Sequence, residues 1–171
     1  MIMEIINSTA DDTATIFKFY DHAIAYQKTK FNKHWQGFDL ELVETEIKEN
    51  RQWKIMMDNT VVCIFAITFN DAAIWGDKDE QPSIYIHRIV TNPLFRGNNF
   101  VNEIITWAKK YGKENGRQFI RMDTWGDNQK LIDYYTKCGF IFLGLSGELN
   151  AKDLPKHYSG IQLSLFEIKI D

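Results

Sequence analysis

The segment that most constrains the fold of this chain is residues 83–101, SIYIHRIVTNPLFRGNNFV. Its first part, Ser83–Thr91, is predicted to form a strand, and the Asn-Pro pair that follows favours a turn. The Arg-Gly-Asn-Asn run then opens a long stretch with the apolar spacing of a helix. The first N–H groups of a helix have no partner within the helix, and the helix dipole favours negative charge there. The segment therefore predicts an anion-binding helix N-terminus that any phosphate-bearing cofactor could use.

The size and charge of the chain indicate one ordinary globular domain over residues 1–171. A net charge of -3 gives no support to a nucleic-acid partner. The two cysteines, Cys63 and Cys138, show no metal-binding spacing, so we expect reduced core thiols and no metal site. No secretory signal and no apolar run of about 20 residues is evident, which predicts a cytoplasmic protein without a membrane partner.

The chain alternates between strand and helix patterns in the order strand, two helices, three strands, helix, strand, helix and two strands. Residues 26–38 are expected to be a loop or broken helix, and the polar tract 70–82 is expected to link two strands. The strand–helix–strand part implies a parallel pair, and the three consecutive strands favour an antiparallel meander with a tight turn at Asp58-Asn59. We therefore expect an α/β (α+β mixed) fold: a central mixed, mostly antiparallel sheet of about seven strands, with helices on both faces. The expected strands are 2–7, 52–57, 61–69, 83–91, 118–124, 140–143 and 161–170, and the expected helices follow Ser8 or Thr9 and span 39–50, 99–115 and 128–138.

Two motifs lie at the ends of the last two predicted helices. Arg96, Gly97, Asn98, Asn99, Phe100 and Val101 follow a strand and begin a helix, while Asn128 precedes Tyr135 by seven residues and Tyr135 is followed three residues later by Gly139-Phe140. Together with the element order, these motifs resemble those of the GCN5-related N-acetyltransferase family. The resemblance covers nearly the whole chain in element order, and residues 85–140 at the level of motifs.

The first motif departs from the family pattern, which is Arg or Gln, two residues, Gly, one residue, then Gly or Ala. Asn99 stands at the first glycine position and Val101 at the second. Asn tolerates left-handed backbone angles better than other non-glycine residues, so Asn99 is expected to preserve the turn. Val101 places a branched side chain where the family keeps the backbone open to the cofactor.

The resemblance implies an enzyme that uses acetyl-CoA and lets a primary amine attack the thioester directly in a ternary complex. The pyrophosphate would lie on the N–H groups of residues 96–101, with the Arg96 side chain adding charge. Backbone groups of Ile89, Val90 and Thr91 would bind the pantetheine arm and polarise the acetyl carbonyl. Arg96 has the alternative interpretation of a solvated cation at the start of a helix.

Proton transfer requires further residues. By motif match Tyr135 would protonate the departing thiolate, although it could instead be a packed core aromatic. Asn128 would be either a cofactor contact or simply the helix cap. His87 is the candidate base, on the strand where the similar aralkylamine acetyltransferases carry a histidine, and the alternative is a half-buried structural histidine. Asp123 on the next strand is a second candidate base.

The acceptor is expected between two loops, residues 26–38 and 145–160. Their candidate contacts are Tyr26, Phe31, Trp35, His157 and Tyr158, with His34, Glu148 and Asp153 nearby in the sequence. Aromatics beside carboxylates suit a small-molecule amine, which we favour over protein N-termini or lysines. A non-catalytic acyl-CoA sensor on the same fold remains an alternative. A nucleotide-binding protein is disfavoured because GxxxxGK[ST] and GxGxxG are absent, and a homodimer is possible.

Overall fold

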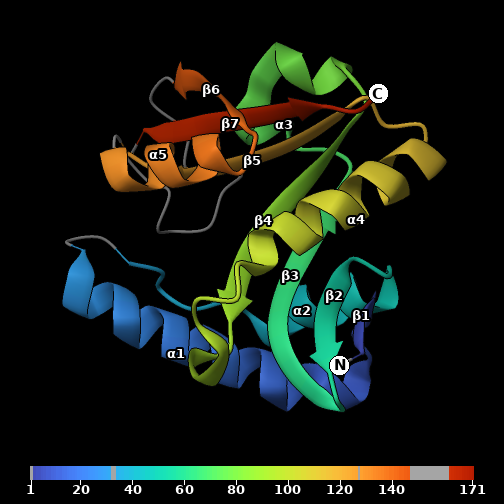
Figure 1. Ribbon diagram of the computed structural model, residues 1–171, viewed down its shortest axis with the longest axis vertical. Coiled ribbons are helices and arrows are strands. Elements are labelled where there is room, and N and C mark those ends of the chain that lie inside the picture. The colour runs from blue at the N-terminus through green and yellow to red at the C-terminus, as the bar shows by residue number, and fades with distance from the viewer. Residues whose placement is uncertain (1, 32–33, 127, 147–161) are drawn as a thin grey trace. The chain divides into compact units, whose positions relative to one another are not determined.

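The computed structural model describes residues 2–31, 34–126, 128–146 and 162–171. Within them the chain forms seven strands interspersed with α-helices and short 3-10 turns (Figure 1). In chain order these are β1 (Met3–Asn7), η1 (Ala10–Asp12), α1 (Thr13–Lys30), α2 (Leu40–Lys48), β2 (Gln52–Met57), β3 (Thr60–Thr68), α3 (Ala72–Trp75), η2 (Gly76–Glu80), β4 (Ser83–Thr91), η3 (Pro93–Phe95), α4 (Phe100–Glu114), β5 (Phe119–Trp125), α5 (Gln129–Lys137), β6 (Ile141–Leu145) and β7 (Leu163–Lys169).

The strands belong to one sheet in the order β1-β2-β3-β4-β5-β7-β6. The β1–β2, β2–β3, β5–β7 and β6–β7 pairs are antiparallel, whereas β4 and β5 are parallel through Ser83 to Tyr85. The expected fold class, a mixed and mostly antiparallel sheet with helices, is therefore confirmed. The helical crossover α4 accounts for the parallel pair, because two parallel neighbours need a long connection.

The chain divides into two compact units. The first consists of residues 1–67 and 88–100, and the second of residues 68–87 and 101–171. Strand β4 therefore contributes its first five residues to the second unit and its last four to the first. The expectation of a single domain over 1–171 stays a prediction.

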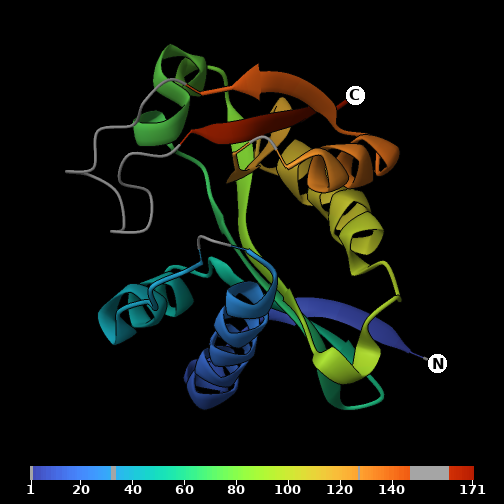
Figure 2. The ribbon, with the colours of Figure 1, turned by 90° about the vertical axis from the view of Figure 1, so that its left-hand side faces the viewer.

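The predicted meander comprises the strands β2, β3 and β4: β2 and β3 pair antiparallel as expected, β4 is the next strand in the sheet, and β1 adds a further antiparallel partner to β2. Both residues of the β2–β3 turn, Asp58 and Asn59, have positive φ, at 47° and 68°. That geometry is required of a two-residue hairpin turn whose twist matches that of its strands, and Asn and Asp tolerate it. Helices α1 and α2 pack on this sheet (Figure 2). Their shared core contains Ile16, Phe19, Tyr20, Val43, Ile64 and Val90.

In the second unit, helices cover both faces of β7. Successive strand residues face opposite sides of a sheet. Leu163 and Leu165 accordingly pack with Ile74 and Trp75 of α3, while the ring of Phe166 lies 5.4 Å from that of Tyr135 on α5. The arrangement predicted for the fold, helices on both faces, is thus confirmed within this unit.

The structure differs from local expectations at three places. Helix α1 continues to Lys30, so the first five residues of the segment expected to be loop or broken helix are helical. The polar tract 70–82 contains α3 and η2, because Ile74 and Trp75 bury against Tyr85. The helical spacing of residues 39–50 predicts Leu42, Val43 and Ile47 on the buried side. In α2 Val43 is buried and Ile47 packs against the core, but Leu42 is exposed and Glu46 is buried instead.

None of the helices among the described residues is both long enough and apolar enough to cross a membrane.

Candidate active site

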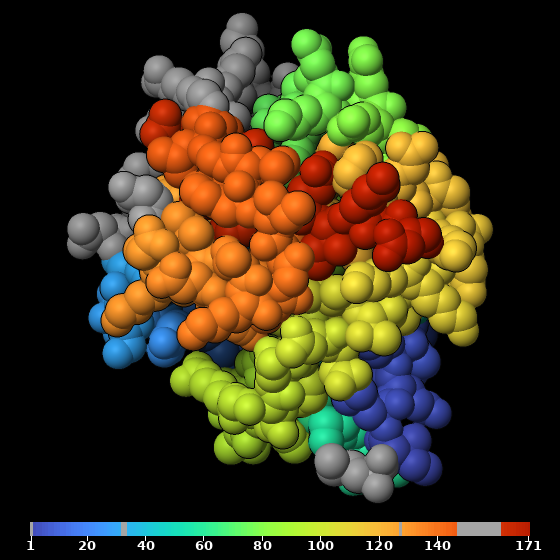
Figure 3. Space-filling view, turned by 45° about the horizontal axis from the view of Figure 1, so that its top comes forward, coloured from blue at the N-terminus to red at the C-terminus, as the bar shows by residue number. Residues whose placement is uncertain are grey.

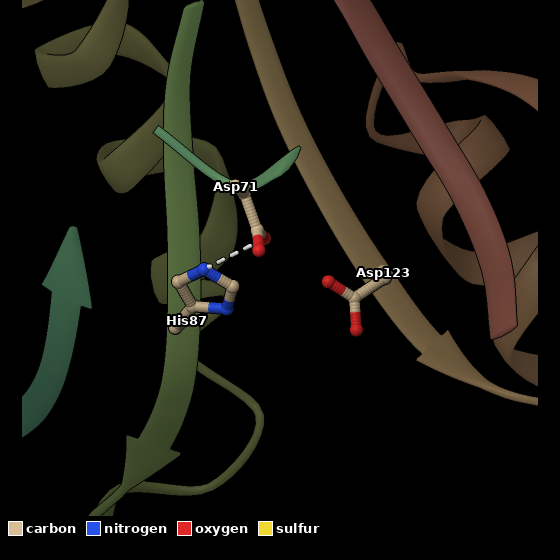
Figure 4. Close-up of side chains that lie close together, drawn as sticks. All are labelled: Asp71, His87 and Asp123. Atoms are coloured by element: carbon tan, nitrogen blue, oxygen red, sulfur yellow. Dashed lines mark ion pairs between the residues drawn. The ribbon is translucent and has the colours of Figure 1, made fainter. Parts of the chain in front are cut away.

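Three titratable side chains of the second unit converge beside β4 (Figure 4). His87 extends from β4, Asp123 from β5, and Asp71 from the residue that precedes α3. An oxygen of Asp71 lies 3.2 Å from Nε2 of His87. One ring nitrogen of His87 and one carboxylate oxygen each of Asp71 and Asp123 all lie within 4.8 Å of one another. Sequence analysis nominated His87 and Asp123 separately; the structure places them together.

The Asp123 carboxyl is held in an environment that disfavours its charge. Its Oδ2 atom is buried and makes no hydrogen bond to the described residues. Burial raises the pKa of Asp123 to about 6, with a further increase from the neighbouring Asp71 charge, while His87 acts in the opposite direction. A carboxyl with such a pKa changes protonation near neutral pH, which is a common property of groups that transfer protons.

Asp71 is fixed by a chain of polar contacts that ends at a buried arginine. Its backbone N–H donates to Oδ1 of Asp79 at 2.8 Å, and the Tyr85 hydroxyl donates to the same oxygen at 2.6 Å. Arg121 donates from Nη1 to the Tyr85 oxygen at 3.1 Å and from Nε to Glu167 at 2.8 Å. The Arg121 side chain is fully buried, and its guanidinium also lies over the ring of Trp75. Because these charges are compensated, the chain can be rigid without leaving an unpaired buried charge.

Arg88, the residue after His87, has a left-handed backbone with φ of 54°. This conformation is uncommon for a non-glycine residue and costs of the order of 1–3 kcal/mol. In the first unit its guanidinium forms an ion pair with the buried Glu46, donates to the Tyr20 hydroxyl at 3.0 Å, and lies 5.0 Å from the Phe38 ring centre. These contacts hold β4 in an irregular conformation immediately after the candidate base.

The predicted phosphate-binding turn has the backbone expected of it. Gly97 and Asn99 both have positive φ, at 87° and 54°, and residues 96–99 are exposed. The prediction that Asn99 preserves a left-handed turn is confirmed. Phe100 and Val101 are buried at the start of α4. The exposed turn therefore leads directly into the 15-residue helix α4, as anion binding at a helix start requires.

Arg96 and Tyr26, predicted for the cofactor and the acceptor respectively, meet in the first unit. The Arg96 guanidinium lies 4.7 Å from the centre of the Tyr26 ring, a cation–π contact. Arg96 is exposed, and the Tyr26 side chain is 43% exposed. Arg96 is thus held over a ring and yet remains accessible to an anion.

The remaining predicted cofactor residues on β4 follow Arg88. Val90 is buried in the first-unit core, whereas Ile89 and Thr91 are half-buried. The Thr91 hydroxyl lies 4.0 Å from the Cys63 sulfur. Burial raises the pKa of the Cys63 thiol to about 12, so this cysteine is an inert core residue.

Tyr135 and Asn128 lie on α5 in the second unit. The Tyr135 ring packs against Phe140 and Phe166 and is only half-buried, so it combines a packed ring with a partly accessible position. Asn128 is the N-cap of α5, and its side chain accepts from the N–H of Leu131 at 3.3 Å. The helix-cap interpretation of Asn128 is therefore confirmed, and a cofactor contact through its amide nitrogen stays a prediction.

The predicted acceptor residues fall into three groups. Tyr26 and Phe31 are exposed on and just after α1. Trp35 packs against Tyr20 and Phe38 in the first-unit core, which supports a structural role for it. His157 and Tyr158, like Glu148 and Asp153, lie outside the described residues.

Sequence reasoning missed Asp71, Arg88 with Glu46, and Arg121 with its partners. A local signal exists only for Asp71, which stands before Ala72-Ala73-Ile74-Trp75 in the position of a helix cap. Its approach to His87 depends on long-range folding of residues 71–80 onto Tyr85. No single-sequence pattern encodes that approach.

Comparison with known proteins agrees with the fold and the motifs. The model of the acetyltransferase (GNAT) family matches residues 18–140, which is more than half of the chain. Over 74 residues the chain is 30% identical to the uncharacterized N-acetyltransferase YesJ of Bacillus subtilis (strain 168). That match spans 43% of this chain and 41% of the relative, so less than half of the relative's length is covered.

Two solved structures show the same fold. An acetyltransferase of the GNAT family from Listeria monocytogenes 4b F2365 has a TM-score of 0.78 at 22% identity, covering 98% of this chain and 94% of that one. The acetyltransferase yncA from Salmonella typhimurium, solved with its cofactor acetyl-CoA, has a TM-score of 0.70 at 12% identity, with 100% and 95% covered. The family match extends through the β4 strand, the Arg96 turn and the Tyr135 motif, and on that match the chain belongs to the acetyltransferase (GNAT) family.

Proposed function

We propose that this protein transfers the acetyl group of acetyl-CoA to a primary amine of a small molecule. The observation that carries the proposal is the exposed left-handed turn at Gly97 and Asn99, which opens helix α4 beside Arg96. Family membership supports acetyl transfer, and the carboxylates around His87 support an acceptor that arrives as a cation.

The turn fits the phosphates of coenzyme A. A Cβ added at Gly97 would meet no atom within 4 Å, so the backbone there is open to a bulky ligand. The N–H groups at the start of α4 supply partial positive charge, and the Arg96 guanidinium adds a full one. Residues 96–101 would hold the pyrophosphate, and the backbone of Ile89, Val90 and Thr91 would hold the pantetheine arm. When bound, acetyl-CoA supplies an activated thioester.

The chain's own residues would move two protons. His87 takes a proton from the ammonium of the acceptor, and the amine then forms its C–N bond to the acetyl carbon as the C–S bond breaks. Tyr135 would give its hydroxyl proton to the departing thiolate, and the second proton, which the nitrogen loses as the amide forms, would restore the Tyr135 hydroxyl. A general acid or base of this kind contributes about 10²–10⁴-fold to a rate.

The acceptor is proposed to be a small amine because aromatic residues and carboxylates are available to it. In the second unit Asp123 offers negative charge beside His87, and in the first unit Tyr26 and Phe31 offer exposed rings. These features match the cation–π and ionic recognition of an ammonium group. His157 and Tyr158 remain proposed contacts on the basis of sequence alone.

A thermal melt with and without acetyl-CoA is the first test, with ATP and NAD as controls. Ligand at about a hundred times its dissociation constant adds roughly 2.7 kcal/mol of stability, which corresponds to roughly 5 to 10 °C in a domain of this size. We expect a shift with acetyl-CoA alone. No shift would mean that Val101 or Asn99 closes the site, and the proposal would be wrong.

Turnover with a panel of small amines, N-terminal peptides and lysine peptides then separates the remaining candidates. Acetylation of a small amine supports the proposal. Acetylation confined to peptides would point to a protein acceptor, and binding without any turnover would indicate an acyl-CoA sensor.

We further propose a cytoplasmic location and a homodimer. Cys63 and Cys138 are free thiols, as reduced proteins of that compartment have. Strand β6 stands at the end of the strand order and exposes Ile141, Phe142 and Leu145. Figure 3 shows the orange part of the chain, near residue 140, at the surface. Light scattering during size-exclusion chromatography of the wild type and Ile141→Lys tests the dimer: we expect a dimer that the lysine weakens.

A further inference from the structure

The imidazole of His87 lies between two carboxylates that come from different elements. Asp71 approaches from the start of α3 and Asp123 from β5 (Figure 4). The Asp71 oxygen is 3.2 Å from Nε2, and the second ring nitrogen is on the side of the ring that faces Asp123. The Asp71 backbone N–H donates to Asp79, whose oxygen also accepts from the Tyr85 hydroxyl.

A carboxylate beside one imidazole nitrogen decides which nitrogen carries the proton. An ionised carboxylate is only an acceptor, so the nearby nitrogen is favoured as N–H, and in the neutral ring the lone pair is then on the other nitrogen. Asp71 lies 3.2 Å from Nε2, whereas Asp123, on the Nδ1 side and also among the described residues, forms no ion pair with His87 within 4.0 Å. The closer carboxylate therefore decides, and the basic nitrogen is Nδ1. The same negative charge stabilises the imidazolium that forms when Nδ1 takes a proton.

We propose that Asp71 is a positioning residue that keeps the proton of neutral His87 on Nε2 and makes Nδ1 the basic nitrogen. The inference rests on the proposed function for the role of His87 in catalysis, although the protonation state it describes exists without substrate. Asp71 touches neither acceptor nor cofactor in this proposal; it acts through the ring.

The anchoring of Asp71 supports the assignment. Its segment carries α3 and η2, whose Ile74 and Trp75 are buried against Tyr85. Asp79 accepts hydrogen bonds from the Asp71 backbone and from the Tyr85 hydroxyl. Arg121 of β5 donates a hydrogen bond to the Tyr85 oxygen. Packing of its segment and charge-assisted hydrogen bonds therefore fix the position of Asp71. A residue that orients a catalytic side chain needs such support.

Asp71→Asn tests the proposal, because it removes the charge and leaves the backbone contact with Asp79. Asp77→Asn is the matched control: it makes the same change in η2, where the side chain is exposed. Asp71→Glu is the conservative variant that restores a carboxylate. His87→Gln identifies the His87 signals among the four histidines.

The first readout is an NMR titration of the ring nitrogens, which needs no activity. In the wild type we expect the Nε2–H tautomer, and in Asp71→Asn a lower pKa for His87 and a mixed tautomer. Asp77→Asn should match the wild type, and Asp71→Glu should recover most of the effect. An Nδ1–H tautomer in the wild type, or an unchanged titration in Asp71→Asn, would overturn the proposal.

The second readout is kinetic. Asp71→Asn should lower kcat about tenfold to a hundredfold, which is less than the roughly 10²–10⁴-fold of a general base itself because His87 is retained, and should move the alkaline rise of the rate to lower pH. The KM for acetyl-CoA and the acetyl-CoA melting shift should not change. If no variant turns over any amine, the proposed function fails while the NMR titration still decides the state of His87. If turnover occurs and Asp71→Asn has wild-type kcat and pH profile, the positioning role fails alone.

Discussion

Single residues in this protein combine structural and chemical roles that can be separated by conservative substitution. Tyr135 packs its ring against Phe140 and Phe166 and remains partly accessible. Asp123 has a buried oxygen and a raised pKa next to a histidine. In each case one atom can be changed while the packing is kept.

Tyr135→Phe should lower turnover by about 10²-fold and leave acetyl-CoA affinity nearly unchanged, because only the hydroxyl that protonates the thiolate is removed. Steady-state kinetics together with isothermal titration of acetyl-CoA measures both quantities. Tyr134→Phe, on the same helix, is the matched control and should keep turnover. Unaltered turnover in Tyr135→Phe would remove Tyr135 from the acid role.

Asp123→Asn should stabilise the protein at neutral pH. The pKa of Asp123 is about 6 in the folded protein against 3.8 ordinarily, so this group contributes stability below pH 4 that is lost as pH rises through about 6. A neutral amide does not ionise, so the variant avoids this decrease in the free energy of unfolding, which is of the order of 2–3 kcal/mol at neutral pH. Urea unfolding from pH 4 to 8 should show a difference between variant and wild type that grows up to about pH 7. A constant difference would contradict the assigned pKa.

At the scale of elements, β4 is positioned by contacts on either side of the His87–Arg88 bond. Residues 71–80 hold the His87 side through Asp71 and Tyr85. Helices α1 and α2 hold the Arg88 side through Tyr20 and Glu46. The left-handed Arg88 is stable because its guanidinium meets these partners.

Glu46→Ala should destabilise the protein by about 3–5 kcal/mol, since it leaves the nearly buried Arg88 guanidinium without its carboxylate. Thermal or urea unfolding measures this loss. Glu44→Ala, exposed on the same helix, is the control and should change stability by less than about 0.5 kcal/mol. Equal effects of the two variants would show that the Arg88–Glu46 pair adds little.

The sequence predicted most elements because their signals are local. Ser83–Thr91 forms β4 with the predicted bounds, and Asp58-Asn59 makes the predicted turn. Prediction from the sequence failed where tertiary contacts, rather than local composition, decide the secondary structure. The polar tract 70–82 contains a short helix because Ile74 and Trp75 pack against Tyr85 in the core of the second unit. Two of the three cluster residues, His87 and Asp123, could be predicted from the sequence, while Asp71 approaches His87 only in the folded chain.

On the scale of the whole molecule, neither compact unit is a continuous piece of chain. The first unit needs residues 88–100 in addition to residues 1–67, and the second needs residues 68–87 as well as residues 101–171. Strand β4 belongs to both. Loss of β4 pairing would therefore remove a strand from each unit at once.

We expect one cooperative unfolding transition for this reason. Hydrogen exchange followed by mass spectrometry at increasing urea measures β3 in the first unit and β5 in the second. Both should lose protection at the same urea concentration. Two separate midpoints would show that the units unfold independently.

The shared strand also sets an order of events on the ribosome. Strand β3 is next to β4 in the sheet, so the first 67 residues emerge without the segment that completes their unit. At about 5–20 residues per second, the further 33 or so residues up to Phe100 take roughly two to seven seconds to synthesise. During that time the nascent chain presents an uncovered β3 edge and a first-unit core that lacks Val90. Chaperone demand during translation should accordingly be concentrated in this early interval.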